Sequence, residues 1–170
     1  MRPRWSLLVA CIAALGFSGC AGYRLGPGSG AAAKTSIQVS PFINRTLAPR
    51  MGGDVTAALR KSLQRDGTYQ LATRGDSDIV VTGEITRYDR SELSYRPSDI
   101  LTVLDYRVTM TAHVTARERR SGKTILDRDV TGYTLVRTGS DLTSAEQRAL
   151  PLLAEDLANN ITALLVDGDW

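Results

Sequence analysis

The chain has 170 residues and a formal net charge of +3, from 21 lysines and arginines against 18 acidic residues. Arg2 and Arg4 lie in the predicted signal peptide, and without them the basic count falls to 19, so the rest of the chain is close to neutral. Nucleic-acid-binding domains are usually strongly basic, and we therefore exclude nucleic acid as a partner.

Residues 1–19 have the pattern of a secretory signal peptide, with a positively charged start, an apolar run from Trp5 to Phe17 and small residues before Cys20. The apolar run is shorter than the about 20 residues that cross a bilayer. With its cysteine directly after two small residues, the segment resembles the lipobox of bacterial lipoproteins. This resemblance implies that Cys20 carries a diacylglycerol and an N-acyl chain, and we expect no other cofactor. The alternative is an ordinary signal peptide in which Cys20 is incidental.

Residues 20–34 are rich in glycine and are predicted to be the lipidated N-terminus and a flexible tether. Cys11 is lost with the signal peptide and Cys20 is acylated in this interpretation, so no cysteine is left for a disulfide. In bacterial lipoproteins an aspartate after the cysteine signals retention in the inner membrane. Ala21 at that position therefore implies a protein that is lipid-anchored to the outer membrane, on its periplasmic side.

A single domain, 35–170, is predicted to begin with a strand and a helix. The segment 37–42 alternates between apolar and polar residues, as a strand does. Apolar residues then recur at helical spacing over 51–63, and Asp66-Gly67 ends the helix. Because a glycine in a helix interior costs about 1 kcal/mol, the glycine pair early in this segment predicts that the helix begins only at Asp54.

The middle of the chain predicts three longer strands. Residues 79–88 form the first, and the polar segment 89–103, which contains a proline, is predicted to be a loop. Over 104–117 apolar and polar residues alternate strictly, which is typical of an antiparallel strand with one face on a core. A hairpin turn at 119–123 then leads into a strand at 124–135.

The last predicted element is a helix that ends at Asp167-Gly168. The segment 143–146 has the pattern of a capping box, and apolar residues at helical spacing follow it. Pro151 lies inside this helix and is expected to kink it or split it. The element order β-α-β-β-β-α predicts an α+β fold, in which a mainly antiparallel four-stranded sheet carries two helices on one face.

The sequence contains no recognisable catalytic or metal-binding motif. Its one histidine, His113, lies among threonines, where a surface position is more common than a catalytic role. The acidic pairs Asp76/Asp78 and Asp127/Asp129 lack further ligands at the spacing that metal sites need. Nucleophile motifs and phosphate-binding glycine loops are also missing. We therefore predict that the protein is not an enzyme and holds no metal.

Two surface features remain for a binding function. The polar side of the strand 104–117 is either an ordinary solvated face or a surface that docks on a polar wall; its residues include Arg107, Thr109, Thr111 and His113. Basic residues occur in and near the predicted loops, namely Arg90, Arg96, Arg119, Arg120 and Lys123. Arginine and lysine suit phosphate contacts, although exposed turns are often charged without binding any ligand.

Several short motifs follow one another along the chain. They are the lipobox cysteine, Gly22-Tyr23-Arg24-Leu25, Pro41-Phe42-Ile43-Asn44-Arg45-Thr46, the strand 77–85, Tyr106-Arg107-Val108, the turn Ser121-Gly122-Lys123 and the helical segment 153–158. In their order and spacing they resemble the lipopolysaccharide-assembly lipoprotein family LptE, over essentially the whole chain after the signal peptide.

This resemblance implies an outer-membrane lipoprotein that sits as a plug inside the LptD β-barrel, helps the barrel to assemble and binds lipopolysaccharide on its way to the cell surface. It also implies that the five basic residues named above contact lipopolysaccharide, and the four polar-strand residues are predicted to face the barrel. The alternative is a periplasm-facing lipoprotein that regulates a peptidoglycan synthase or forms a secretion pore, because the strand 78–83 is similar to such lipoproteins as well.

Overall fold

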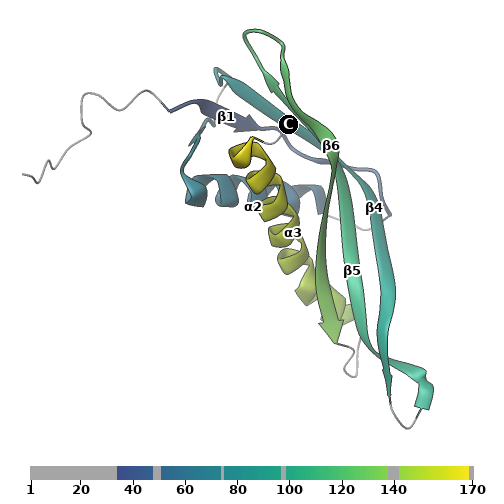
Figure 1. Cartoon of the computed structure of the whole chain (residues 1–170). Helices are drawn as coiled ribbons and strands as arrows, with labels where there is room; N and C mark the ends of the chain where they lie inside the picture. Colours follow the sequence, from purple (N-terminus) through teal and green to yellow (C-terminus); the bar gives the residue numbers. More distant parts are fainter. Residues whose placement is uncertain (1–33, 48–50, 74, 97–98, 138–141, 169–170) are drawn as a thin grey trace, which may run out of the picture. The chain divides into compact units, whose positions relative to one another are not determined.

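The computed structural model of the protein describes residues 34–47, 51–73, 75–96, 99–137 and 142–168 (Figure 1). The predicted signal peptide, Cys20 and nearly all of the predicted tether lie outside these ranges. The elements of the described part are β1 (Ser36–Val39), β2 (Ile43–Asn44), α2 (Met51–Asp66), β3 (Gln70–Leu71), β4 (Ile79–Arg96), β5 (Asp99–Glu118), β6 (Thr124–Arg137) and α3 (Leu142–Asp167).

The strands of the described residues form one mixed, six-stranded sheet, which corrects the prediction of a mainly antiparallel four-stranded sheet. In the order β3-β1-β4-β5-β6, β1 is parallel to both of its neighbours, and the short β2 pairs in parallel with β4 further along that strand. Among the described strands, only the β4–β5 and β5–β6 pairs are antiparallel. The parallel pairs arise because α2 connects β2 to β3 and returns the chain to the end of the sheet at which β1 begins. Alternation in a short strand does not reveal its direction.

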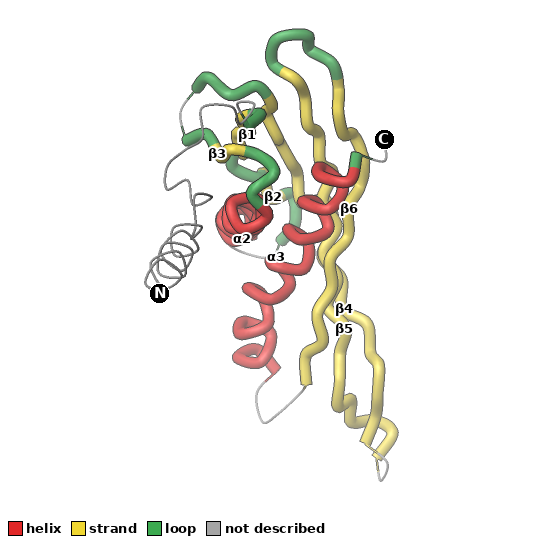
Figure 2. Tube along the Cα trace, turned by 60° about the vertical axis from the view of Figure 1, so that its left-hand side comes forward, coloured by secondary structure: helices red, strands yellow, loops and turns green. Residues whose placement is uncertain are grey.

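β4 and β5 form a long hairpin, so the prediction of a loop at 89–103 is wrong. β4 continues to Arg96 and β5 starts at Asp99, with Arg90 opposite Val108 in the register. Both views show this hairpin extending past the start of α3 (Figures 1 and 2). Leu93 and Tyr95 are exposed there. Backbone pairing with β5 holds residues 89–95 of β4 in place, and none of these seven side chains is buried, so their sequence does not alternate between apolar and polar residues.

α2 starts at Met51, three residues before the predicted start at Asp54. A Cβ atom at position 52 would lie 2.4 Å from the carbonyl oxygen of Phe42, whereas one at Gly53 would meet nothing within 4 Å. Gly52 therefore allows the first turn of the helix to approach the chain after β1 closely. The buried residues of α2 are Met51, Val55, Thr56, Leu59, Ser62 and Leu63.

α3 is one helix, so Pro151 does not split it. Its length and apolar composition are sufficient for a membrane span, but its apolar side chains at Leu153, Leu157, Ile161 and Leu165 are buried in the core with those of α2 and the sheet. It is therefore a core helix. Figure 2 shows α2 and α3 on the same side of the sheet.

α3 crosses β6 in direct backbone contact at Gly132. A Cβ atom at this position would lie 2.5 Å from the backbone nitrogen of Leu157 and 2.7 Å from its Cα. Any side chain at position 132 would therefore push the helix away from the strand.

The outer edge of β6 is occupied by side chains of α3 at the same crossing. The backbone N–H of Tyr133 donates to Oδ2 of Asp156 (2.9 Å), and Nδ2 of Asn160 donates to the carbonyl oxygen of Thr131 (2.9 Å). These contacts block pairing of another strand with this part of β6.

Candidate functional site

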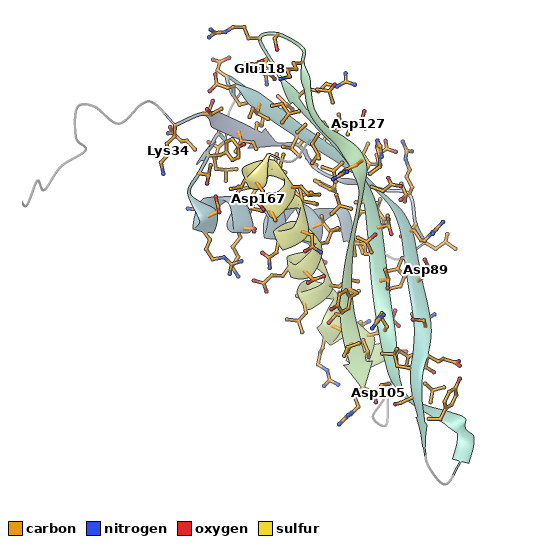
Figure 3. The ribbon with its side chains drawn as sticks, viewed as in Figure 1. Lys34, Asp89, Asp105, Glu118, Asp127 and Asp167 are labelled. Carbon is orange, nitrogen blue, oxygen red and sulfur yellow. The ribbon has the colours of Figure 1, made fainter. Side chains whose placement is uncertain are left out.

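The side of the sheet that faces away from α2 and α3 is a polar surface of β4, β5 and β6, which we call the polar face. The β5 residues Val108, Met110, Ala112, Val114 and Ala116 are buried in the core. Alternation puts the residues between them on the polar face, where Arg107 and His113 are exposed and Thr109 and Thr111 half-buried. The structure thus brings the four predicted barrel-facing residues onto one surface, and Figure 3 shows Asp89 and Asp127 on the same side.

β4 and β6 supply the neighbours of these residues on the polar face. In the register, Arg107 lies between Ser91 and Leu135, Thr109 between Asp89 and Tyr133, Thr111 between Arg87 and Thr131, and His113 between Glu84 and Asp129. The Arg107 guanidinium carbon lies 5.2 Å from the centre of the Tyr133 ring, in cation–π geometry. Sequence reasoning missed these neighbours, because the alternation within one strand does not show how it is paired.

Charged side chains of the polar face are paired with neighbouring charges, one of them from the segment after β2. Nη2 of Arg45 lies 3.2 Å from Oε1 of Glu84, and Nε of Arg137 lies 3.0 Å from Oδ1 of Asp105. Hydrogen bonds from Arg45 lower the pKa of the Glu84 carboxyl, and those from Ser94 and then Arg137 lower the pKa of the Asp105 carboxyl. As far as the described residues extend, the face therefore presents charges of alternating sign that are neutralised by their neighbours, with no extended field of one sign.

His113 is held between two carboxylates of β6. Its Nδ1 lies 2.9 Å from Oδ1 of Asp129 and its Nε2 lies 2.9 Å from Oδ1 of Asp127. Both ring nitrogens can donate only when the imidazole is protonated. The hydrogen bond to Asp129, followed by the charges of both aspartates, raises the pKa of His113 above its ordinary value of 6.5.

We expect His113 to stabilise the fold at acidic pH. Because its pKa is higher in the folded than in the unfolded protein, its contribution is fully present below about pH 6.5. The contribution is lost as the pH rises through the raised pKa. Urea unfolding at pH 5.5 and pH 9 should show that His113→Gln lowers the free energy of unfolding more at the lower pH. If His113→Gln lowered the free energy of unfolding equally at both pH values, the ion-pair geometry would be contradicted. Asp129→Asn should make the stability of the protein less dependent on pH.

The basic residues of the β5–β6 turn have different surroundings. Nε of Arg119 donates to the carbonyl oxygen of Ser77 (3.1 Å), and its Nη2 donates to Oε1 of Gln38 (3.2 Å). Arg119 therefore connects the turn to β1 and to the segment just before β4. Arg120 and Lys123 are exposed at the same turn.

Arg90 lies far from that turn. The backbone of Arg119 is bonded to that of Asp78 just before β4, and Arg90 lies about 40 Å further along the strand at about 3.3 Å per residue. Nη1 of Arg90 lies 3.1 Å from Oε2 of Glu146 on α3, and the Tyr88 hydroxyl donates to the same carboxylate. Burial and this hydrogen bond raise the pKa of Tyr88.

The structure therefore does not bring the five predicted lipopolysaccharide-binding residues together. Arg119, Arg120 and Lys123 lie at one end of the long strands and Arg90 toward the other. Arg96 is the last residue of β4, beyond Arg90, and its side chain is outside the described part.

Among the described residues, no three histidine or acidic side chains are arranged to hold a metal ion. Asp127 and Asp129 contact opposite nitrogens of the His113 ring, so the ring separates the two carboxylates. The arrangement fits surface recognition better than metal chemistry.

Comparison with known proteins identifies the architecture. The model of the family LptE, described as lipopolysaccharide-assembly, matches residues 35–165. Similar solved structures include protein XCC0632 from Xanthomonas campestris (13% identity, TM-score 0.56, covering 86% of this chain and 94% of that one). A minor lipoprotein from Acinetobacter baumannii (17%, 0.53, 80% and 96%) and the PelC dodecamer from Paraburkholderia phytofirmans (16%, 0.51, 79% and 90%) are also similar. At these identities the structures show a shared fold, and no curated protein matches the sequence.

Proposed function

Because the chain belongs to the LptE family of lipopolysaccharide-assembly lipoproteins, we propose that it docks by its polar face inside the LptD β-barrel of the outer membrane. In this proposal it helps the barrel to assemble and binds lipopolysaccharide during transport. The family is non-enzymatic, which confirms the prediction that the chain is not an enzyme. It is a lipoprotein family of the bacterial envelope.

The proposed anchor is Cys20, with three acyl chains. Each buried methylene contributes about 0.8 kcal/mol, and a single chain binds a membrane only weakly and reversibly. Three chains would keep the protein at the outer membrane throughout the transport cycle.

The polar face is the observation that carries the docking proposal. The lumen of an outer-membrane barrel is polar, so a partner inside it needs a hydrophilic surface. Hydroxyl groups and paired charges cover the polar face, and the apolar face of the same sheet is already buried under α2 and α3. Docking of the polar face therefore requires no rearrangement of the core.

Isolation of the lipidated protein from outer membranes in mild detergent tests this proposal. We expect one large β-barrel partner at a ratio of one to one. A ring of copies of this chain, or a bound peptidoglycan synthase, would contradict the proposal and support the alternative of a secretion pore or a synthase regulator.

We propose that lipopolysaccharide phosphates bind at the β5–β6 turn, to Arg120 and Lys123. Arg119 is already engaged by Ser77 and Gln38, and Arg90 is paired with Glu146. Arg120 and Lys123 are exposed.

Replacing both residues, Arg120→Ala with Lys123→Ala, should weaken lipopolysaccharide binding about tenfold, because two charge-assisted phosphate contacts are lost. Binding is measured at fixed salt, since such contacts are screened. The control removes the same charge from exposed helix positions, with Lys61→Ala and Arg148→Ala. Equal binding by the two double variants would exclude the turn from the site.

A further inference from the structure

Within the part of the chain that the structure describes, one edge of β4 is partly unpaired. β1 covers Ile79–Val81 and β2 covers Glu84–Ile85, and no described strand pairs with that side of β4 beyond Ile85. An open strand edge is a template for pairing with another chain. We infer that the segment Arg87–Glu92 of this edge takes up an extended strand of the barrel partner by β-strand addition, an inference that rests on the proposed function.

The hydrogen bonds of β1 and β2 show which backbone groups of β4 point outward. The carbonyl oxygens of Val81 and Ile85 accept from Ser40 and Arg45 on this outer side. The register shifts by one residue after Ile85. Beyond this bulge the even-numbered residues therefore present their N–H and C=O groups to the open edge.

The opposite side of the sheet gives the same result. The backbone N–H of Tyr133 donates to α3 and is therefore directed away from β5. The backbone N–H and C=O groups of its register partner Thr109 must then be directed toward β4. Thr109 pairs with Asp89, whose backbone N–H and C=O groups are therefore directed toward β5. The backbone groups of Tyr88 and Arg90 are thus directed outward.

The open segment is regular and has defined ends. Register shifts lie between Ile85 and Arg87 on one side and between Glu92 and Ser94 on the other, and the pairing with β5 is uninterrupted between them. Tyr88, Arg90 and Glu92 therefore offer three N–H and three C=O groups in one row, enough for a short added strand.

A groove lies along the inner side of the same edge. It has a volume of about 420 Å³, and Tyr88 and Arg90 line it together with the apolar side chains of Leu47, Met51 and Leu150. Leu47 is fully exposed, whereas Met51 is buried. In β-strand addition the main chain provides affinity and pockets for alternate side chains provide specificity. The groove would accept an apolar side chain of the added strand.

The open edge is continuous with the polar face, which is why we assign it to the barrel partner. Arg87 and Asp89 of β4 lie directly opposite Thr111 and Thr109 on β5. A partner that covers the polar face would therefore reach the β4 edge without leaving the sheet. At the other edge, Asp156 and Asn160 of α3 occupy the outward groups of β6.

Hydrogen exchange of single amides tests the inference in the full complex. In the isolated protein the amides of Tyr88, Arg90 and Glu92 should exchange rapidly, whereas those of Asp89 and Ser91, bonded to β5, should be protected. Binding of the barrel should slow the first group at least tenfold. Unchanged exchange in a complex that does form would overturn the inference and leave the proposed function intact.

Two variants separate main-chain pairing from side-chain contacts. Glu92→Pro removes an outward N–H without removing a bond to β5, and proline is tolerated at such edge positions. It should weaken barrel binding at least tenfold more than Glu92→Ala does, at an unchanged melting temperature. Leu47→Asp should also weaken binding, whereas the control Leu152→Asp, at an exposed position of α3, should not.

Equal binding by Glu92→Pro and Glu92→Ala would overturn strand addition. Protection of the outward amides in the isolated protein that grows with concentration would show that a second copy fills the edge, and would also overturn the inference. If no barrel is isolated with the unaltered chain, the proposed function fails, and this inference fails with it.

Discussion

Gly132→Ala is expected to lower the free energy of unfolding by about 3 kcal/mol, at the upper end of the range for overpacking in a core. The added Cβ would lie 2.5 Å from the backbone nitrogen of Leu157, and a helix backbone cannot rotate away as a side chain can. α3 must therefore move as a whole, which also pulls Leu153 and Ile161 from the core. Chemical denaturation with far-ultraviolet circular dichroism measures the change.

Gly53→Ala is the matched control for this experiment. The same methyl group is added, but at position 53 it meets nothing within 4 Å. Alanine is favoured over glycine in a helix by up to about 1 kcal/mol, so this variant should be as stable as the unaltered chain or more stable. If Gly132→Ala were also neutral, α3 and β6 would not be in backbone contact.

Replacement of Thr109 and Thr111 by tryptophan is expected to weaken barrel binding about a hundredfold, or about 2.8 kcal/mol. Both residues lie at the centre of the polar face, and their strand positions tolerate aromatic residues. The fold should therefore survive, while two large side chains keep the face from approaching the barrel wall. Titration of the refolded barrel with the two proteins measures the effect.

The control for the polar-face variant carries the same two tryptophans on the helix layer, at Lys61 and Gln64 of α2. These positions are exposed and lie on the opposite side of the sheet. We expect this control to bind the barrel about as tightly as the unaltered protein does. Loss of binding in the helix variant, with normal binding in the Thr109 and Thr111 variant, would assign the interface to the helices.

The elements that could be predicted from the sequence are those that bury one face in the core. β5 alternates because its even-numbered residues from Val108 to Ala116 are covered by the core, and α2 and α3 show their apolar stripes for the same reason. The outer half of the β4–β5 hairpin lacks this covering. Its sequence therefore resembles that of a loop, although the backbone is paired.

Other features depend on contacts between segments distant in sequence. In the sequence, Gly132 is only a residue that is unfavourable in a strand, and its close contact with the backbone of Leu157 is visible only in the structure. The sequence shows Asp127 and Asp129 only as an acidic pair without further ligands, because nothing in it indicates that His113 lies between them. The basic residues were grouped by their nearness to predicted loops. Because 89–96 continues β4 and 99–103 begins β5, Arg90 lies far along the hairpin from the β5–β6 turn.

Thiol labelling of the polar face tests the central proposal most directly. Cys11 and Cys20 are the only cysteines in the chain, so Thr131→Cys would introduce a single free thiol at an exposed polar-face position if the signal peptide is removed and Cys20 is acylated. We expect rapid reaction with a maleimide in the isolated protein and a rate at least tenfold slower in the barrel complex. Equal rates in a complex of one to one stoichiometry would show that the polar face is not the docking surface.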